Sequence, residues 1–459
     1  MQYHMECKTP PGIKPYFASG MRHWFICFFF VQGLAALSQP VLTLQEALRL
    51  GLEQNFDVRL AKNEVELARD GNTPGMAGFF PSISFNLGGN LQSSNLSQRF
   101  ASGLAVDRPG VVGSGLNGSM QLNWLFFDGG KMFITSKRLG RQLTAAEIRL
   151  QNQVMGFADS LSSAYYQVVL TGLELKALEQ SARSIEERIR ISTEQERAGT
   201  RPASDAIQAR MDLNISKNKI LAQKRQIEIR KGALNLLIGR EPDVDFLASD
   251  SVKIPGRIAY SDLKNRILEK NLGLQSQKEA LEISRLGMAE LNTRMLPQIG
   301  LNMALNYQRS SSNGGFALYN RNIGPLAGIN LSLPIFNGVS LSRQLRMAGR
   351  ELEGKQMQLK LTETRLLFQA WRNLQLLETS LESMDTEKAN LELAQQNLRI
   401  IQDRFRLSLT TSLELREAEN QLENSRIRLQ QYRYQSRITA NLLLRLSAEL
   451  DVEAKESKK

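Results

Sequence analysis

Histidine and cysteine, the side chains most often used in catalysis and metal binding, occur only near the start of this chain. The cysteines are Cys7 and Cys27, and the histidines are His4 and His23. The rest of the chain therefore has no means to form a His-based triad, a thiol nucleophile or a common zinc site. Carboxylates remain, but no glycine-rich phosphate loop accompanies them. We expect no catalytic residue, no cofactor, no metal site and no enzymatic activity.

Residues 1–38 have the features of a signal peptide. Arg22 precedes an apolar run at 24–31, and the small residues at 36–38 offer a cleavage site. Met21 is an alternative start, since the polar extension before it adds nothing that a leader needs. A retained membrane anchor is disfavoured because the apolar run is too short to span a bilayer. We therefore expect an exported protein whose mature chain lacks both histidine and cysteine.

The chain is basic overall, with a formal net charge of +12 in 459 residues. Its basic residues are mixed with acidic ones along helical stretches, as in the run 186–190, and no block of five like charges occurs. Such mixtures are typical of a solvated helix surface. A nucleic-acid partner would need the excess charge to gather on one face, and we expect no such partner.

Two proline-free stretches, 129–197 and 338–406, have the pattern of very long helices. Apolar residues recur in them every three, four or seven positions, which is the 3.5-residue period of coiled-coil packing. Each helix would extend about 100 Å, so each must lie along other helices rather than cap a compact core. After a polar turn the chain returns as a helix at about 203–238, which predicts an antiparallel helical hairpin.

Before each long helix the apolar period changes to two. Residues 82–95 and 117–127 alternate apolar with polar side chains, and a loop rich in Gly, Ser and Asn through about residue 113 lies between them. A second pair of strands is expected at 299–307 and 329–335. Four such strands cannot close a barrel, so the chain must oligomerise if their apolar faces meet lipid.

The chain is internally duplicated. An offset of 216 relates Asn55 and Pro81 to Asn271 and Pro297, and an offset of 209 carries the long helix and its hairpin onto the second copy. We therefore expect helical hairpins of equal length in a fold that is mainly α with a membrane β part. The boundaries that follow are a first repeat at 39–239, a linker at 240–260, a second repeat at 261–450 and a charged tail at 451–459.

These motifs resemble the outer membrane efflux protein family typified by TolC. The most specific pieces are the helix start at 44–48, the turns at 127–130 and 335–338 after the strand pairs, and the first tip at 197–199. The resemblance implies a homotrimer with a twelve-strand β-barrel in outer membrane lipid and a twelve-helix α-barrel in the periplasm. It also implies two partners, an inner-membrane transporter and a periplasmic adaptor that docks on the helical tips.

The function implied is an outer membrane channel of a tripartite efflux or type I secretion system, which passively conducts substrates outward. Residues that match the family's periplasmic gate and selectivity positions are Asp205, Phe405, Thr410, Glu414 and Glu417. The tips expected to dock the adaptor carry Arg197, Gly199, Thr200, Arg406, Ser408 and Thr411. Rings of carboxylates at a narrow mouth would favour cations.

The chain departs from the family pattern at three of these positions. Phe405 and Thr410 stand where better-known members carry a tyrosine and an arginine that latch the closed mouth, and Ser408 stands where glycine is usual. These departures leave open how the mouth is held shut.

Other interpretations also stay open. A non-channel periplasmic coiled-coil scaffold would pair the same strands in a soluble sheet, and independence of detergent would distinguish it from a channel. A channel dedicated to protein secretion shares the fold with one for small molecules, and the sequence does not separate them. Glu414 and Glu417 have an alternative interpretation as ordinary exposed charges of a helix.

Overall fold

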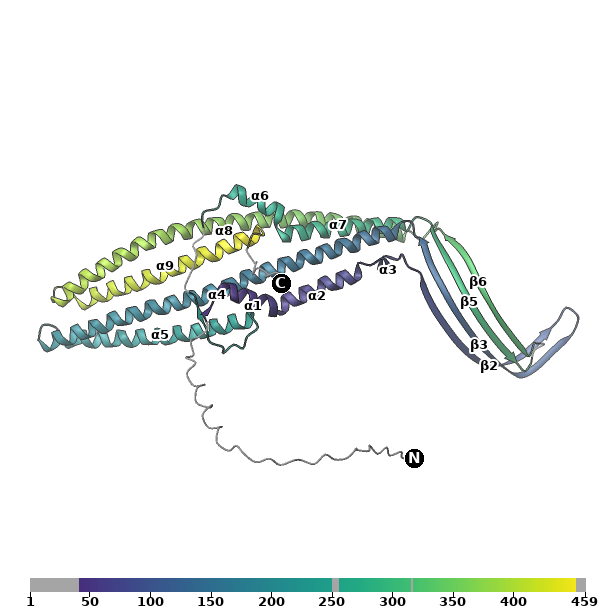
Figure 1. Ribbon diagram of the computed structural model, residues 1–459, viewed down its shortest axis with the longest axis horizontal. Helices are drawn as coiled ribbons and strands as arrows, with labels where there is room; N and C mark the ends of the chain where they lie inside the picture. The colour runs from purple at the N-terminus through teal and green to yellow at the C-terminus, as the bar shows by residue number, and fades with distance from the viewer. Residues whose placement is uncertain (1–40, 250–255, 315–316, 451–459) are drawn as a thin grey trace, which may run out of the picture. The chain divides into compact units, whose positions relative to one another are not determined.

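The computed structural model describes residues 41–249, 256–314 and 317–450 (Figure 1). The expected signal peptide, both cysteines, both histidines and the charged tail lie outside the described residues. Within the described ranges, no helix combines the length and the apolar character needed to cross a membrane.

Two long helical hairpins make up most of the described chain. Helix α4 (Lys131–Arg197) has 67 residues and turns into α5 (Ala203–Leu237), which has 35. Helix α8 (Ser340–Arg406) again has 67 residues, and α9 (Ser412–Leu446) again has 35. The equal lengths confirm the expectation from the duplicated sequence. Both long helices begin two residues later than predicted, because the chain before each one takes left-handed backbone angles.

The hairpins pack side by side in one layer (Figure 1). Helix α5 packs on α4, α4 packs on α9, and α9 packs on α8. Nearer the strands, α2 (Phe56–Gly71) packs on α4, and α7 (Leu272–Thr293) packs on both α4 and α8. The two long helices are therefore continuous, while shorter helices fill the layer beside them. One edge of the layer is formed by α2 and α5, and the other by α8.

Short elements lie around the middle of the long helices. They are α1 (Leu44–Gln54), α6 (Tyr260–Lys270), β1 (Val41–Leu42) and β4 (Leu247–Ala248), whereas α3 (Pro74–Ala77) lies at the strand end of the helical layer (Figure 1). The backbone N–H of Glu46 donates to the Thr43 hydroxyl at 3.2 Å, so Thr43 caps α1 as its sequence predicts.

Part of the segment expected to be a linker is built into the fold. Strand β4 pairs in parallel with β1, and Phe246 beside it is fully buried. The Tyr165 hydroxyl donates to the Leu42 carbonyl at 2.9 Å and accepts from the Ser249 N–H at 3.0 Å. This end of the segment is therefore anchored to α4 and does not simply span between the repeats.

The four long strands form one antiparallel sheet in the order β2, β3, β5, β6. Their bounds are Ser82–Arg99, Ala105–Phe127, Gln298–Ser312 and Tyr319–Ser332. Strands β2 and β3 are longer than predicted, and the loop expected through residue 113 shrinks to residues 100–104. Ladder hydrogen bonds use only the backbone, so a stretch rich in Gly, Ser and Asn can still pair. Residues 333–335, expected in the last strand, lie outside it.

The register places apolar residues of all strands on one face. One row runs Ile83, Leu122, Met303, Ala327, and the next runs Phe85, Met120, Leu305, Pro325. The row between them, on the opposite face, runs Ser84, Gln121, Ala304, Leu326. Phe85 is 71% exposed, so nothing in the described chain covers the apolar face.

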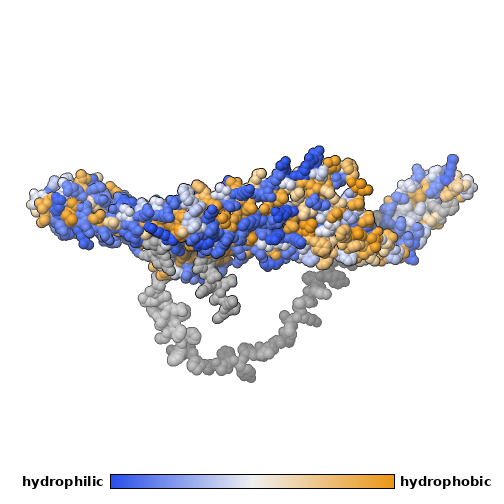
Figure 2. Space-filling view, turned by 90° about the horizontal axis from the view of Figure 1, so that it is seen from above, coloured by the Kyte–Doolittle hydropathy of each residue, from blue (hydrophilic) through white to orange (hydrophobic). Residues whose placement is uncertain are grey.

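Apolar side chains also gather where the helices lead into the sheet (Figure 2). The exposed residues at this junction are Phe80, Phe133, Met295, Leu296, Ile335 and Phe336. Ile335 and Phe336 are 94% and 81% exposed. An exposed band of this kind marks a surface that meets something other than water.

Candidate functional site

The two hairpin tips have the same turn built from different residues. Gly199 has φ +71° after α4, and Ser408 has φ +61° after α8. In both turns the left-handed residue donates its N–H to the carbonyl three residues back, at 2.9 Å for Gly199 and 3.0 Å for Ser408. Ser408 therefore takes a conformation that favours glycine, which explains why glycine is the usual residue at this position.

Gln195 joins the first hairpin to the end of α8. Its amide Nε2 lies 2.8 Å from the Phe405 carbonyl, 3.1 Å from the Arg406 carbonyl and 3.3 Å from the Ser408 hydroxyl. The last carbonyls of a helix have no partner within that helix. The Gln195 amide therefore satisfies the exposed end of α8 from the neighbouring hairpin, a contact that the sequence did not single out.

Arg201 lies at the centre of the contact between the tips. Its guanidinium carbon is 4.1 Å from the centre of the Phe405 ring, and Phe405 is fully buried. Its Nη1 donates to Asp205 at 3.0 Å, and its Nη2 donates to the Thr410 carbonyl. The Arg201 side chain is only 9% exposed. Sequence reasoning missed this arginine because two of its partners, Phe405 and Thr410, lie on the other hairpin.

Thr410 and Glu414 extend the same set of contacts along α9. The Thr410 hydroxyl donates to the Glu414 carboxylate, and the Glu414 N–H donates to the Thr411 hydroxyl at 3.2 Å. Glu414 thus also stabilises the beginning of α9, where a carboxylate meets the helix dipole favourably. Glu417 is exposed one turn further along.

The gate residues inferred from the sequence are thereby separated into two groups. Asp205, Phe405, Thr410 and Glu414 form one connected set around Arg201, and Glu417 stands apart from it.

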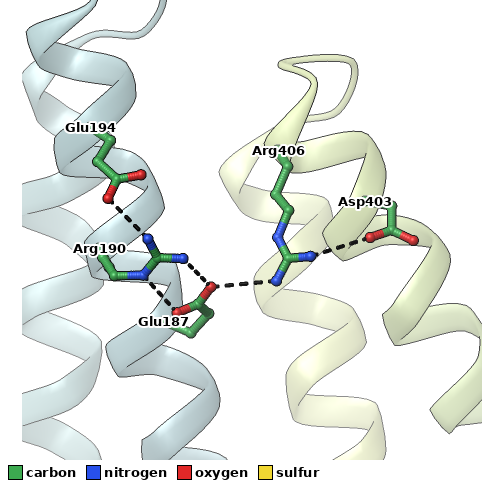
Figure 3. Close-up of polar contacts among 5 residues, drawn as sticks. All are labelled: Glu187, Arg190, Glu194, Asp403 and Arg406. Atoms are coloured by element: carbon green, nitrogen blue, oxygen red, sulfur yellow. Dashed lines mark hydrogen bonds and ion pairs between the residues drawn. The ribbon is translucent and has the colours of Figure 1, made fainter.

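A second, exposed link between α4 and α8 is a chain of ion pairs (Figure 3). Arg190 contacts Glu187 at 2.7 Å and Glu194 at 2.9 Å. Arg406 contacts the same Glu187 at 3.4 Å and Asp403 at 3.5 Å. The Arg190 guanidinium holds the pKa of Glu187 below its usual range, and Arg406 adds to this effect. Because these groups are exposed, salt screens them and each pair contributes little.

The model of the family described as outer membrane efflux protein matches residues 47–240 and 263–449. The chain belongs to the outer membrane efflux protein family. This confirms the resemblance inferred from the motifs. Because the family consists of outer membrane efflux proteins, the chain lies in the outer membrane, with its helical part in the periplasm.

Individual relatives are distant in sequence but similar in fold. The proteases secretion protein PrtF of Dickeya chrysanthemi is 19% identical over 356 residues, which cover 76% of this chain and 75% of PrtF. The outer membrane protein VceC of Vibrio cholerae is 18% identical, with a TM-score of 0.69 over 89% of this chain and 96% of VceC. The outer membrane channel CmeC of Campylobacter jejuni is 17% identical, with a TM-score of 0.72 over 89% of this chain and 86% of CmeC. These likenesses confirm the mainly helical fold with paired strands.

The tips of this outer membrane efflux protein present polar and apolar groups to solvent. Those inferred from the sequence are all exposed, namely Arg197, Gly199, Thr200, Arg406, Ser408 and Thr411. Leu407, Leu409 and Leu413 of the second tip are also exposed, at 69%, 64% and 62%. Sequence reasoning described only the first tip as polar and did not single out these leucines of the second.

The charge pattern of this family member is not purely a surface feature. The run 186–190 was expected to be solvated, but the Arg188 side chain is 1% exposed. The expectation was wrong at Arg188, although Glu186 and Arg190 are exposed as expected. Helix α4 is packed on two sides, by α5 and by α9, so a side chain that does not face α5 can still be buried by α9.

Proposed function

We propose that three copies of this chain form an outer membrane channel of a tripartite efflux or type I secretion system. In this role the channel passively conducts substrates that an inner-membrane transporter delivers, and a periplasmic adaptor docks on the hairpin tips. Membership of the outer membrane efflux protein family supports the class of function. The observation that carries the assembly is that both edges of the described chain are unfinished.

The edges of the sheet call for a neighbour. Strands β2 and β6 each pair with a single strand of the described chain. An open edge leaves a row of backbone groups without partners, which is not tolerated in lipid. Pairing β6 of one copy with β2 of the next would satisfy both edges and close the sheet into a ring.

The edges of the helical layer call for the same neighbour. On α5, Ile207, Met211 and Ile215 are exposed at intervals of four residues. On α8, Leu393 and Ile400 are exposed seven residues apart, and exposed Leu407 continues this spacing just after the helix ends. Both spacings place the side chains in a stripe along one face of a helix. The rotation that joins β6 to β2 would bring α8 of one copy against α5 of the next.

Three copies fit the function better than two. Two copies would give an eight-stranded barrel, whose interior is filled by its own side chains. Three copies would give twelve strands and leave room for a conducting lumen, with the apolar rows of the sheet toward lipid. The exposed aromatic and apolar band at the strand–helix junction would then lie at the membrane surface, where such side chains are enriched.

We assign the tip contacts to the closed mouth of this channel. The Arg201 set and the Gln195 amide would hold the two hairpins of each copy together, while exposed Glu417 and the partly engaged Glu414 would face the narrow entrance. Arg197, Gly199, Thr200 and the exposed second tip would dock the adaptor. Secretion of a protein is the second candidate for the cargo, and the name of PrtF as a proteases secretion protein favours it.

The proposal is tested by the mass and conductance of the full chain purified in detergent. We expect a trimer that gives ion channels in planar bilayers. A stable monomer in detergent would contradict the assembly. A monodisperse protein obtained without detergent would instead support the periplasmic scaffold.

A further inference from the structure

Arg188, Asp212 and Glu419, which we call the Arg188 cluster, join three helices behind the tips. They belong to α4, α5 and α9, so the cluster spans both hairpins. Arg188 Nη2 donates to Asp212 Oδ2 at 2.8 Å, and Arg188 Nε lies 3.3 Å from Glu419 Oε2. The exposed fractions of these side chains are 1% for Arg188, 13% for Asp212 and 4% for Glu419.

The surroundings of the cluster fix its charge. On α9, Glu423 lies one turn beyond Glu419 and pairs with Lys219 of α5 at 3.1 Å. On α5, the Gln208 amide donates to Asp212 at 3.0 Å. Helix α8 contributes the apolar Ala394 and Leu398 to the core that packs on this part of α9. The cluster itself therefore holds one guanidinium and two carboxylates.

The two carboxylates are not equivalent. Asp212 accepts hydrogen bonds from both Arg188 and Gln208, whereas neither oxygen of Glu419 has a hydrogen-bond partner in the described chain. A buried ionised carboxylate without hydrogen bonds is costly, and a proton removes that cost. Burial raises the pKa of Glu419 to about 7, with Asp212 and Glu423 adding to the rise and Arg188 opposing it.

We propose that Glu419 is a proton-responsive lock between the two hairpins, closed when its carboxyl is protonated and weakened when it ionises. The proposed lock depends on the proposed function in one respect: it assumes that the mouth of the channel opens when the two hairpins separate. Because Glu419 binds its proton more tightly in the buried cluster than in water, protonation favours the closed state, in which the two hairpins are packed together. That stabilisation is complete below about pH 4.5 and is lost as the pH rises through about 7.

Hydrogen exchange of the full chain in detergent tests the lock. Amide protection in the segments of α4 and α9 around the cluster is measured from pH 4 to 9, relative to intrinsic exchange. We expect wild-type protection to fall by up to about tenfold per pH unit between about pH 4.5 and 7, which is the limit for one linked proton, and to level off above pH 7. Glu419→Gln, which is neutral at every pH, should remove this dependence. Glu186→Gln changes an exposed carboxylate two positions from Arg188 and should retain it.

A second variant keeps the test decisive if Glu419→Gln does not fold. Asp212→Asn leaves Glu419 as the only carboxylate of the cluster facing Arg188, so the pH dependence should move to lower pH. Equal pH dependence in the wild type and Glu419→Gln, or an unmoved profile in Asp212→Asn, would overturn the lock. Absence of conductance in the same samples would contradict the proposed channel. The exchange profiles would still test the lock, because they do not depend on conductance.

Discussion

The Arg201 guanidinium stacks on the ring of Phe405, 4.1 Å from its centre, and so ties the first hairpin tip to the second. Cation–π contacts of this kind contribute about 0.5–2 kcal/mol, more when they are desolvated. The phenylalanine at this position lacks the hydroxyl of the tyrosine that the family resemblance led us to look for. Its ring face instead receives a cation, and that cation comes from the other hairpin.

Removing Arg201 should loosen the closed mouth. Arg201→Ala deletes the stacking on Phe405, the pair with Asp205 and the bond to the Thr410 carbonyl. We expect the closed state to lose about 1–3 kcal/mol of stability relative to the open state, which raises the open fraction roughly 5- to 150-fold in planar-bilayer recordings. The open fraction of Arg201→Lys should lie between those of the wild type and Arg201→Ala, because lysine keeps the positive charge but lacks the planar guanidinium. Arg210→Ala, on the exposed side of α5, is the control. Wild-type opening in Arg201→Ala would show that this contact does not hold the mouth.

The two faces of the sheet should respond differently to charge. Leu122→Arg or Leu331→Arg places a cation on the apolar face, at a cost of roughly 2–4 kcal/mol near mid-membrane. Asn123→Arg and Ser332→Arg are matched controls, since each changes the adjacent residue on the opposite face. We expect only the leucine variants to lower the yield of heat-stable trimer in detergent. Equal losses from both kinds of site would mean that the lipid-facing side is assigned wrongly.

The carboxylates of α9 should set ion preference at the entrance. Changing Glu414 and Glu417 to glutamine together removes negative charge from every copy and keeps hydrogen-bonding capacity for Thr410. We expect lower cation preference and weaker block by multivalent cations in planar bilayers, because such rings act in a narrow, poorly screened space. Assembly should persist, since the buried seam of α9 runs through Leu415, Leu422 and Leu429. Unchanged selectivity would show that both glutamates are ordinary surface charges with no effect on ion passage.

The duplicated turns allow a reciprocal test of backbone strain. Val339 has φ +66° before α8, whereas its counterpart before α4 is Gly130 with φ +85°. Because a β-branched residue is strained at positive φ, Val339→Gly should stabilise the fold by about 1 kcal/mol. Gly130→Val should destabilise it by a similar amount, although a Cβ there meets nothing within 4 Å. Midpoints of thermal unfolding in detergent should therefore shift in opposite directions. Shifts of the same sign would reject strain as the cause.

The sequence by itself determined the elements and their duplication. A 3.5-residue apolar period demands long packed helices, and an offset that carries one hairpin onto the other demands equal lengths. Period-two alternation likewise set the two faces of the strands. Local signals were equally reliable, as with Thr43 at the start of α1 and Gly199 at the first tip, because capping and left-handed turns depend on residues close together in the chain.

Only the tertiary structure decided which charged residues are buried and which distant residues meet. Arg188 has the same sequence surroundings as its exposed neighbour Arg190, and the difference comes from a third helix, α9, packed on that side of α4. Arg201 contacts Phe405 only because the two hairpin tips, which are far apart in the sequence, lie next to each other in the fold. An amphipathic pattern states that a helix has a buried face, but it does not state how many neighbours share that helix, and it is the number of neighbours that buries Arg188 and Glu419.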